Sequence, residues 1–153
     1  MLAHTKLDAI SAIYQRRAVR QYTAEKIARE TVEQLIDAAV HAPTAVHREP
    51  WAFVVVQNEK RLRHYSDRAK SLLLADQKAK SFFQAAEPKA LAAFYDASTL
   101  VIIGCAERGP FVEADCWLAA ENLMLAATAS GLGTLLVCRK NQWQLAREGL
   151  RSF

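Results

Sequence analysis

Residues 37–57 read DAAVHAPTAVHREPWAFVVVQ, and this stretch runs from the end of a helix through a rigid loop into a strand. The apolar side chains that lead into it recur at helical spacing: Val32, Leu35, Ile36, Ala39 and Val40. Pro43 follows the pattern and would end that helix. Residues 51–57 are aromatic and β-branched without polar alternation, which predicts a strand buried on both faces.

The same patterns predict elements on both sides of this stretch. Helices are expected over residues 7–16, 59–74 and 111–130. Asn58 would cap the second of these, and Gly131 and Gly133 would end the third. Strands are expected at 99–106 and 134–138. Short apolar strands separated by helices predict an α+β or α/β fold, with a central sheet flanked by helices.

Length and composition indicate one globular domain over residues 1–153. Hydrophobic residues make up 52% and charged residues 24%, as in ordinary folded proteins. No apolar run reaches the roughly 18 residues that a membrane span needs. The first ten residues, MLAHTKLDAI, carry charge where a signal peptide needs apolar side chains, so we expect a cytoplasmic protein that does not enter a membrane.

The cysteines and histidines do not suggest a metal site. Cys105, Cys116 and Cys138 lie in apolar surroundings and show no C-x-x-C spacing, so we interpret them as buried structural thiols. The four histidines show no metal-ligand spacing either.

The chain is basic, with a net charge of +4 and a pI of about 9.1. Arginines 16, 17 and 20 cluster after the first predicted helix, and a second basic cluster spans 60–68. Nucleic acid, an acidic membrane surface and a phosphorylated small molecule are all anionic partners that such a chain could bind. Nucleic acid is the weakest of these hypotheses, because no aromatic residues are interleaved with the arginines and no recognition-helix pattern is present.

The predicted helix at 111–130 is apolar on nearly all sides. Leu118, Leu123, Met124 and Leu125 cannot all face one direction. A helix of this kind belongs in a core or in a subunit interface, so we expect an obligate homodimer built on it.

Two segments carry the candidate chemistry. Arg16, Arg17 and Arg20 place three guanidinium groups within five residues, a suitable arrangement for phosphate oxygens, although a solvated basic turn is the simpler alternative. The loop at 42–51 combines small residues with Thr44 and two prolines, so its backbone could approach a flat ligand closely. His47 in this loop could donate to a carbonyl or a phosphate.

Taken together, RRAVRQYT at 16–23, the stretch at 37–57 and ADCWLAAENLMLAATASGLGT at 114–134 resemble the nitroreductase family in content, order and spacing. The resemblance covers most of residues 7–134. It implies an α+β nitroreductase-like fold with a central, mostly antiparallel sheet flanked by helices and a long apolar dimer-interface helix. It also implies an FMN-dependent oxidoreductase, in which NADH or NADPH reduces the flavin and an electron-poor acceptor such as a nitroaromatic or a quinone then takes the electrons.

The resemblance assigns site residues by position. Arg16, Arg17 and Arg20 match the basic residues that hold the FMN phosphate and the pyrimidine side of the ring, and Ala18 stands where many members have serine. The loop that the partner subunit lays along the flavin is matched by Pro43, Thr44, Ala45, Val46 and His47. His47 replaces a common asparagine and Glu49 a common glutamine. Thr134 and Leu135 match a stretch that often touches the flavin. The resemblance needs no catalytic side chain and no metal.

The C-terminal segment 135–153 does not match the family pattern in the sequence, so we expect it to be atypical. A truncated or frameshifted product and a naturally minimal member are both consistent with this segment, and Arg139 or Lys140 could replace phosphate ligands. A flavin-binding or regulatory protein without turnover is therefore the alternative hypothesis.

Overall fold

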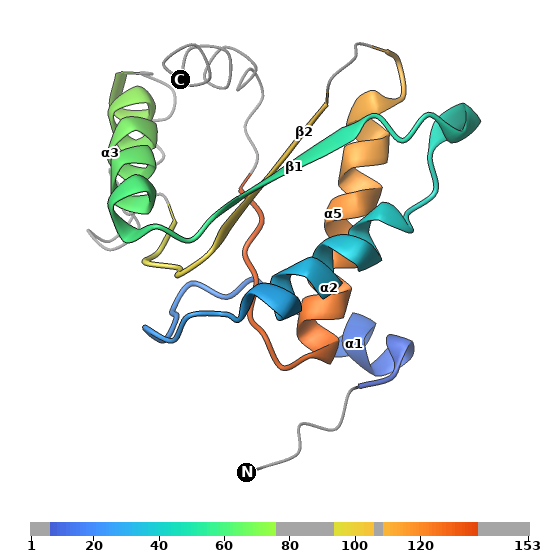
Figure 1. The fold of residues 1–153 in the computed structure, drawn as a ribbon, viewed down its shortest axis with the longest axis horizontal. Coiled ribbons are helices and arrows are strands. Elements are labelled where there is room, and N and C mark those ends of the chain that lie inside the picture. Colours follow the sequence, from blue (N-terminus) through green and yellow to red (C-terminus); the bar gives the residue numbers. More distant parts are fainter. Residues whose placement is uncertain (1–6, 76–93, 106–108, 138–153) are drawn as a thin grey trace.

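A computed structural model of the chain describes residues 7–75, 94–105 and 109–137, and these form an α+β fold (Figure 1). In chain order the helices and strands are α1 (Ala9–Gln15), α2 (Arg29–Val40), the 3-10 turn η1 (Ala45–His47), β1 (Trp51–Val56), α3 (Glu59–Ala75), β2 (Leu100–Cys105) and α5 (Val112–Ala129). Each predicted helix in these ranges is present. The α+β class is therefore confirmed.

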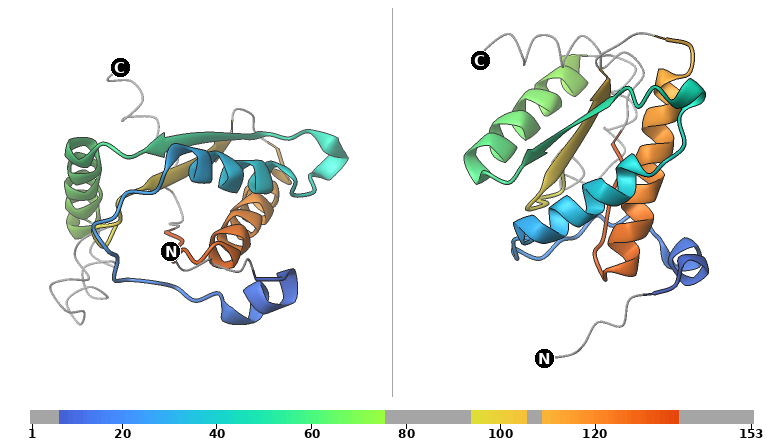
Figure 2. Two further views of the ribbon diagram at one scale, coloured as in Figure 1. Left: turned by 60° about the horizontal axis from the view of Figure 1, so that its bottom comes forward. Right: turned by 45° about the vertical axis from the view of Figure 1, so that its right-hand side comes forward.

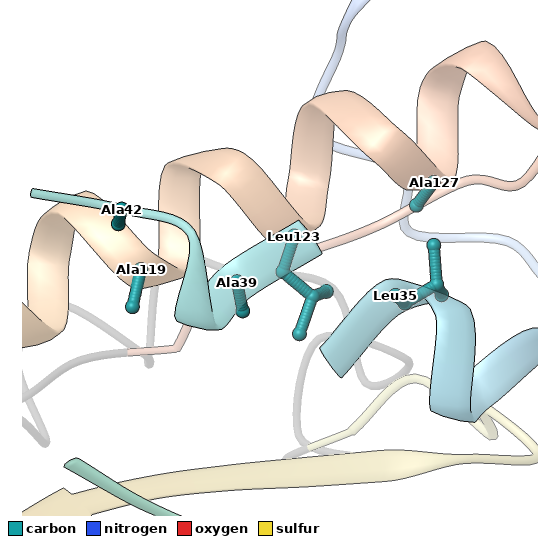
Figure 3. Packing of buried hydrophobic residues seen from close by; sticks show 6 residues of the cluster. All are labelled: Leu35, Ala39, Ala42, Ala119, Leu123 and Ala127. Carbon is teal, nitrogen blue, oxygen red and sulfur yellow. The ribbon is translucent and has the colours of Figure 1, made fainter. Parts of the chain in front are cut away.

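Packing of α2 against α5 builds the core. Small and branched side chains meet at the crossing of the two helices (Figure 3): Leu35, Ala39, Ala42, Ala119, Leu123 and Ala127. Ala39, Ala119 and Ala127 are completely buried, because alanines at a crossing let two helices approach closely. Asn122 adds a polar link, since its side-chain amide donates to the carbonyl of Ala38 over 3.2 Å.

The strands β1 and β2 pair antiparallel, with Trp51 opposite Cys105 and Val56 opposite Leu100. One face of this sheet packs on the α2–α5 core through Trp51, Phe53 and Val101. On the other face, Val54 and its register partner Ile102 are 49% and 41% exposed, whereas Val56 at the end of β1 is buried. The prediction that both strands are buried on both faces is therefore wrong at Val54 and Ile102.

Local hydrogen bonds set where the helices begin and end. Asp8 caps α1 by accepting from the amide of Ser11 at 3.0 Å, and Asn58 accepts from the amide of Arg61 at 3.1 Å at the start of α3, as predicted. At the end of α5, Gly131 has a φ of 75°. Its amide donates to Thr128 and the next amide donates to Ala127, which is a Schellman arrangement that only glycine adopts without strain.

The segment that follows α5 returns to the N-terminal part of the chain. Both views of Figure 2 show α2 crossing α5, with α1 beside the C-terminal end of α5, where the amide of Leu7 donates to Ala129 over 3.2 Å. Ala18 and Thr134 form one parallel β-bridge, in which the amide of Val19 donates to the carbonyl of Thr134 over 2.9 Å. The predicted strand at 134–138 is reduced to this single bridge within residues 134–137, because the chain between Arg16 and Tyr22 runs alongside it for only one residue pair.

Candidate functional site

A hollow of about 370 Å³ lies where three segments of the chain meet. We call it the bridge pocket, since the Ala18–Thr134 bridge forms one of its walls. It is lined by Arg16, Ala18, Arg20, Trp117, Glu121, Met124, Thr134, Leu135 and Leu136. A volume of this size falls in the range of small-molecule sites, which span roughly 300–1,000 Å³.

One face of α5 supplies the floor of the bridge pocket. Trp117, Glu121 and Met124 are spaced by four and three residues, so they line up on one side of the helix. The face that packs on α2 is a different one, formed by Ala119, Leu123 and others. Within one chain, α5 thus packs on the core with one face and lines a pocket with another.

Two of the charged residues of the bridge pocket, Arg16 and Glu121, form an ion pair. The Nε atom of Arg16 lies 3.8 Å from Oε1 of Glu121, and the two side chains are 33% and 49% exposed. Arg20 is an exposed second cation in the lining. Two arginines and one glutamate leave the pocket positive, which favours an anionic ligand.

Thr134 contributes a polar atom that the described residues do not satisfy. Its Oγ1 is buried and finds no hydrogen-bond partner among them, while its backbone carbonyl is already bonded to Val19. Buried hydroxyl groups are normally hydrogen-bonded, so an unsatisfied one in the wall of a pocket is consistent with a ligand. The close approach that forms this wall needs a glycine, because a Cβ on Gly133 would lie 2.8 Å from Cγ2 of Val19.

The structure therefore brings together five of the predicted site residues: Arg16, Ala18, Arg20, Thr134 and Leu135. Arg17 does not line the pocket. Its guanidinium donates to the carbonyls of Tyr14 and Arg16, at 2.6 and 2.8 Å, and so closes the end of α1.

The remaining predicted residues lie in a separate feature, the projecting loop, which spans residues 43–49. Its residues do not line the bridge pocket of their own chain. The backbone of Val46, His47 and Glu49 is left-handed, with φ values of 50°, 54° and 47°. Such values are strained for any residue with a side chain, and most of all for a β-branched one. Val46 is 83% exposed and the side chain of His47 is 91% exposed.

Hydrogen bonds within the projecting loop, and one to α5, fix its conformation. Within it, the amide of His47 donates to the carbonyl of Thr44 over 3.2 Å, and the amide of Glu49 donates to the hydroxyl of Thr44 over 3.3 Å. From outside, Oδ1 of Asp115 accepts from the amide of Ala45 over 3.1 Å. Asp115 is only 4% exposed and is the one buried ionisable side chain in the part of the chain that the structure describes.

Two of the predicted structural thiols fall in the described residues and are half-buried. Burial raises the pKa of both Cys105 and Cys116 above its ordinary value, so the thiols stay neutral at physiological pH. Cys138, Arg139 and Lys140 lie outside the described residues. Within the described ranges, no cluster of His, Cys, Asp and Glu could hold a metal ion, and no helix is long and apolar enough to cross a membrane.

Sequence reasoning did not identify Trp117, Glu121, Met124 and Leu136 as pocket residues. A signal was present, because Glu121 is the one charged residue of α5 beyond its first turn and Trp117 lies four residues before it. Asp115 was missed because acidic residues in the first turn of a helix, here Glu113 and Asp115, are ordinarily exposed and stabilise the helix dipole.

Known proteins resemble this chain over most of its length. The sequence profile of the Nitroreductase family matches residues 13–144, and so extends into the segment expected to be atypical. A relative from Methanothermobacter thermautotrophicus, named provisionally as an NADH dehydrogenase/NAD(P)H nitroreductase, is 30% identical over 135 residues. That match covers 86% of this chain and 61% of the relative, so the chain spans about three fifths of the relative's length.

Solved structures agree with the sequence profile. A nitroreductase with bound FMN from Bacteroides fragilis has a TM-score of 0.71 at 28% identity, covering 82% of this chain and 66% of its own. An FMN-dependent nitroreductase from Clostridium difficile has a TM-score of 0.72 at 29% identity, covering 95% of this chain and 69% of its own. With the profile matching most of the chain and the fold matching these structures, the chain belongs to the nitroreductase family.

Proposed function

We propose that this chain is an FMN-dependent NAD(P)H oxidoreductase that binds its flavin in the bridge pocket. The observation that carries this proposal is the composition of the pocket, in which two arginines and an unsatisfied hydroxyl lie together with the apolar side chains of Trp117, Met124 and Leu135. FMN combines a dianionic phosphate with a flat, hydrogen-bonding ring, so it matches each of these parts. Solved relatives contain FMN, which supports the choice of flavin over other flat anions.

The residues of the bridge pocket fit this cofactor. Arg16 and Arg20 would hold the phosphate, because guanidinium groups donate two parallel hydrogen bonds to phosphate oxygens. The Oγ1 of Thr134 would gain the partner that it lacks, and Met124 and Leu135 would contact the ring. When bound, FMN would supply hydride chemistry between a nicotinamide and an electron-poor acceptor, such as a nitroaromatic or a quinone. The protein itself would bind and orient the flavin and shield it from water.

We propose a homodimer as the active form. Large apolar side chains remain exposed along α1 and α5 of the single chain: Ile10, Ile13, Tyr14, Trp117 and Leu118. Apolar surface gathered on neighbouring helices favours burial against a partner, and an obligate interface would cover roughly 2,000 Å² or more. In such a dimer the projecting loop of one copy would reach the bridge pocket of the other, which explains why it does not line its own.

The test is a spectrum followed by turnover assays. We expect the purified protein, mixed with FMN and freed of excess, to retain a flavin spectrum shifted from that of free FMN. It should then oxidise NADH or NADPH when a quinone or nitroaromatic is added. Retained flavin without oxidation of either nucleotide would select the non-catalytic flavin-binding alternative. A flavin spectrum that stays identical to that of free FMN, even with FMN in excess at about 1 mM, would contradict the proposal.

A further inference from the structure

The projecting loop holds a conformation that an isolated peptide avoids. Three of its residues with side chains, Val46, His47 and Glu49, are left-handed. The two side chains at its tip, those of Val46 and His47, are almost fully exposed and so gain little from packing within the chain. Strain of this kind persists only where the surrounding structure imposes it, so another part of the chain must hold the loop.

Both ends of the loop are fixed on the core. Ala42 precedes it and packs with Ala119 of α5, while buried Pro50 and core-packed Trp51 follow it. Between these ends, a hydrogen bond to another element runs from the amide of Ala45 to the carboxylate of Asp115, across 70 positions of sequence. Asp115 therefore supplies an anchor next to the strained residue Val46.

We infer that Asp115 is a positioning residue, whose buried carboxylate holds the projecting loop so that Val46 and His47 point away from their own chain. The second part of the inference rests on the proposed function: the loop held in this way completes the flavin site of a second copy. A pre-formed loop loses less conformational freedom on binding than a flexible one, so its rigidity would favour the bound state.

Helix stabilisation is the alternative role for Asp115, and the two roles can be separated. Asp115 lies in the first turn of α5, where a negative charge favours the helix dipole, but exposed Glu113 occupies the same turn. Asp115→Asn removes the charge and keeps an oxygen that accepts from Ala45. Asp115→Ala removes both. If Asp115 anchors the loop, the Asp115→Asn variant should keep the loop as rigid as it is in the unmodified protein. If Asp115 only stabilises the helix dipole, Asp115→Asn should have the same effect as Asp115→Ala.

Amide hydrogen exchange on the full chain without flavin tests the first part. In the unmodified protein the amide of Ala45 should exchange as slowly as core amides of α2 and α5, although the loop tip is exposed. Asp115→Ala should speed exchange at Ala45 and His47 by about tenfold or more while Leu35 and Leu123 stay unchanged, and Asp115→Asn should restore slow exchange. Asp37→Ala, which removes an exposed carboxylate from α2, is the matched control and should change none of these rates.

Visible circular dichroism of bound FMN tests the second part, because a purely structural residue would leave the signal of the flavin unchanged in protein that still binds it. We expect Asp115→Ala to alter this signal and weaken FMN binding about tenfold, with Asp115→Asn near the unmodified protein. Fast exchange of the Ala45 amide in the unmodified chain would refute the role of Asp115 as an anchor, and this result does not require Asp115→Ala to fold. Altered loop exchange with an unchanged flavin signal would overturn the role in the cofactor site. Absence of flavin binding would count against the proposed function alone, since the exchange measurement needs no flavin.

Discussion

Arg16 and Glu121 form an ion pair in the wall of the bridge pocket, with Nε of the arginine 3.8 Å from Oε1 of the glutamate. The pair joins the end of α1 to the middle of α5. Both side chains are more than a quarter exposed, so the pair contributes less than about 1 kcal/mol to folding. Its main consequence concerns the ligand, because Glu121 competes with a bound phosphate for Arg16.

Glu121→Gln should therefore tighten FMN binding. Removing the carboxylate frees Arg16 and eliminates repulsion of the phosphate, with an expected gain of about 0.5–1 kcal/mol. Titration of FMN fluorescence measures the effect. The matched control is Glu33→Gln, which breaks the exposed pair with Arg29 on α2 and should leave the affinity unchanged. Weaker binding by Glu121→Gln would show that the carboxylate itself contacts the cofactor.

Arg16→Ala should weaken FMN binding by about 1.5–3 kcal/mol, the range for a charge-assisted hydrogen bond. Arg16→Lys should recover part of the loss, because it restores charge without the planar fork. Arg17→Ala should have a smaller effect, since its guanidinium is bonded to the carbonyls of Tyr14 and Arg16. Titration of FMN fluorescence measures the affinity of all three variants, and Arg29→Ala is the control for the loss of one positive charge. Equal losses for Arg16→Ala and Arg17→Ala would contradict this assignment of roles.

Gly133→Ala should destabilise the fold by about 1–3 kcal/mol through overpacking, because the new methyl group would lie 2.8 Å from Cγ2 of Val19. Urea unfolding measures the loss. Adding Val19→Ala should relieve part of it by removing both Cγ atoms. Gly104→Ala is the matched control, since a Cβ there meets nothing within 4 Å. Equal stability of the two alanine variants would mean that the contact between Gly133 and Val19 is not close.

Strain in the projecting loop can be measured at Val46. Glycine adopts a φ of 50° freely whereas alanine does not, so Val46→Gly should be more stable than Val46→Ala by about 0.5–1 kcal/mol. The control pair lies at exposed Gln34 in α2, where the order should reverse because glycine destabilises a helix. Urea unfolding of the four variants gives both differences. Greater stability of Val46→Ala would show that the loop is not left-handed at this residue.

The proposed dimer predicts that a charge on its apolar surface separates the copies. Leu118 and Ile13 are 45% and 52% exposed in the single chain. Leu118→Glu or Ile13→Glu would place a desolvated charge in the interface, so sedimentation should show half the mass of the unmodified protein. Gln34→Glu, on an exposed face of α2, should remain a dimer. An unmodified chain that sediments as a monomer at micromolar concentration would refute the dimer itself.

Helices and their ends could be predicted from the sequence because their causes are local. The spacing of Val32, Leu35 and Ala39 predicts α2, and Asn58 and Gly131 mark the start of α3 and the end of α5. Each signal depends on side chains within one or two turns. The resemblance to the family, rather than the clustering of the arginines alone, assigned Arg16 and Arg20 to the site, and both line the bridge pocket.

Relationships between distant segments could not be predicted from local patterns. The open face of Val54 and Ile102 depends on which elements cover the sheet, and the single bridge at Thr134 depends on the path of residues 16–22. Hydrophobicity alone cannot distinguish a face of α5 that packs on α2 from one that lines a pocket. The hydrogen bond between Asp115 and Ala45 joins residues 70 positions apart. In the sequence, nothing distinguishes Asp115 from an acidic residue that stabilises the start of a helix.

Binding of FMN to the 153-residue chain is the most direct test of the central claim. We predict saturable binding of one FMN per chain, measured by fluorescence titration, with a dissociation constant on the order of micromolar or tighter, equivalent to about −8 kcal/mol. Bound FMN should also raise the melting temperature, because it binds only the folded protein. Absence of saturable binding at FMN concentrations on the order of 1 mM, with the chain folded, would contradict the assignment of the bridge pocket as a flavin site.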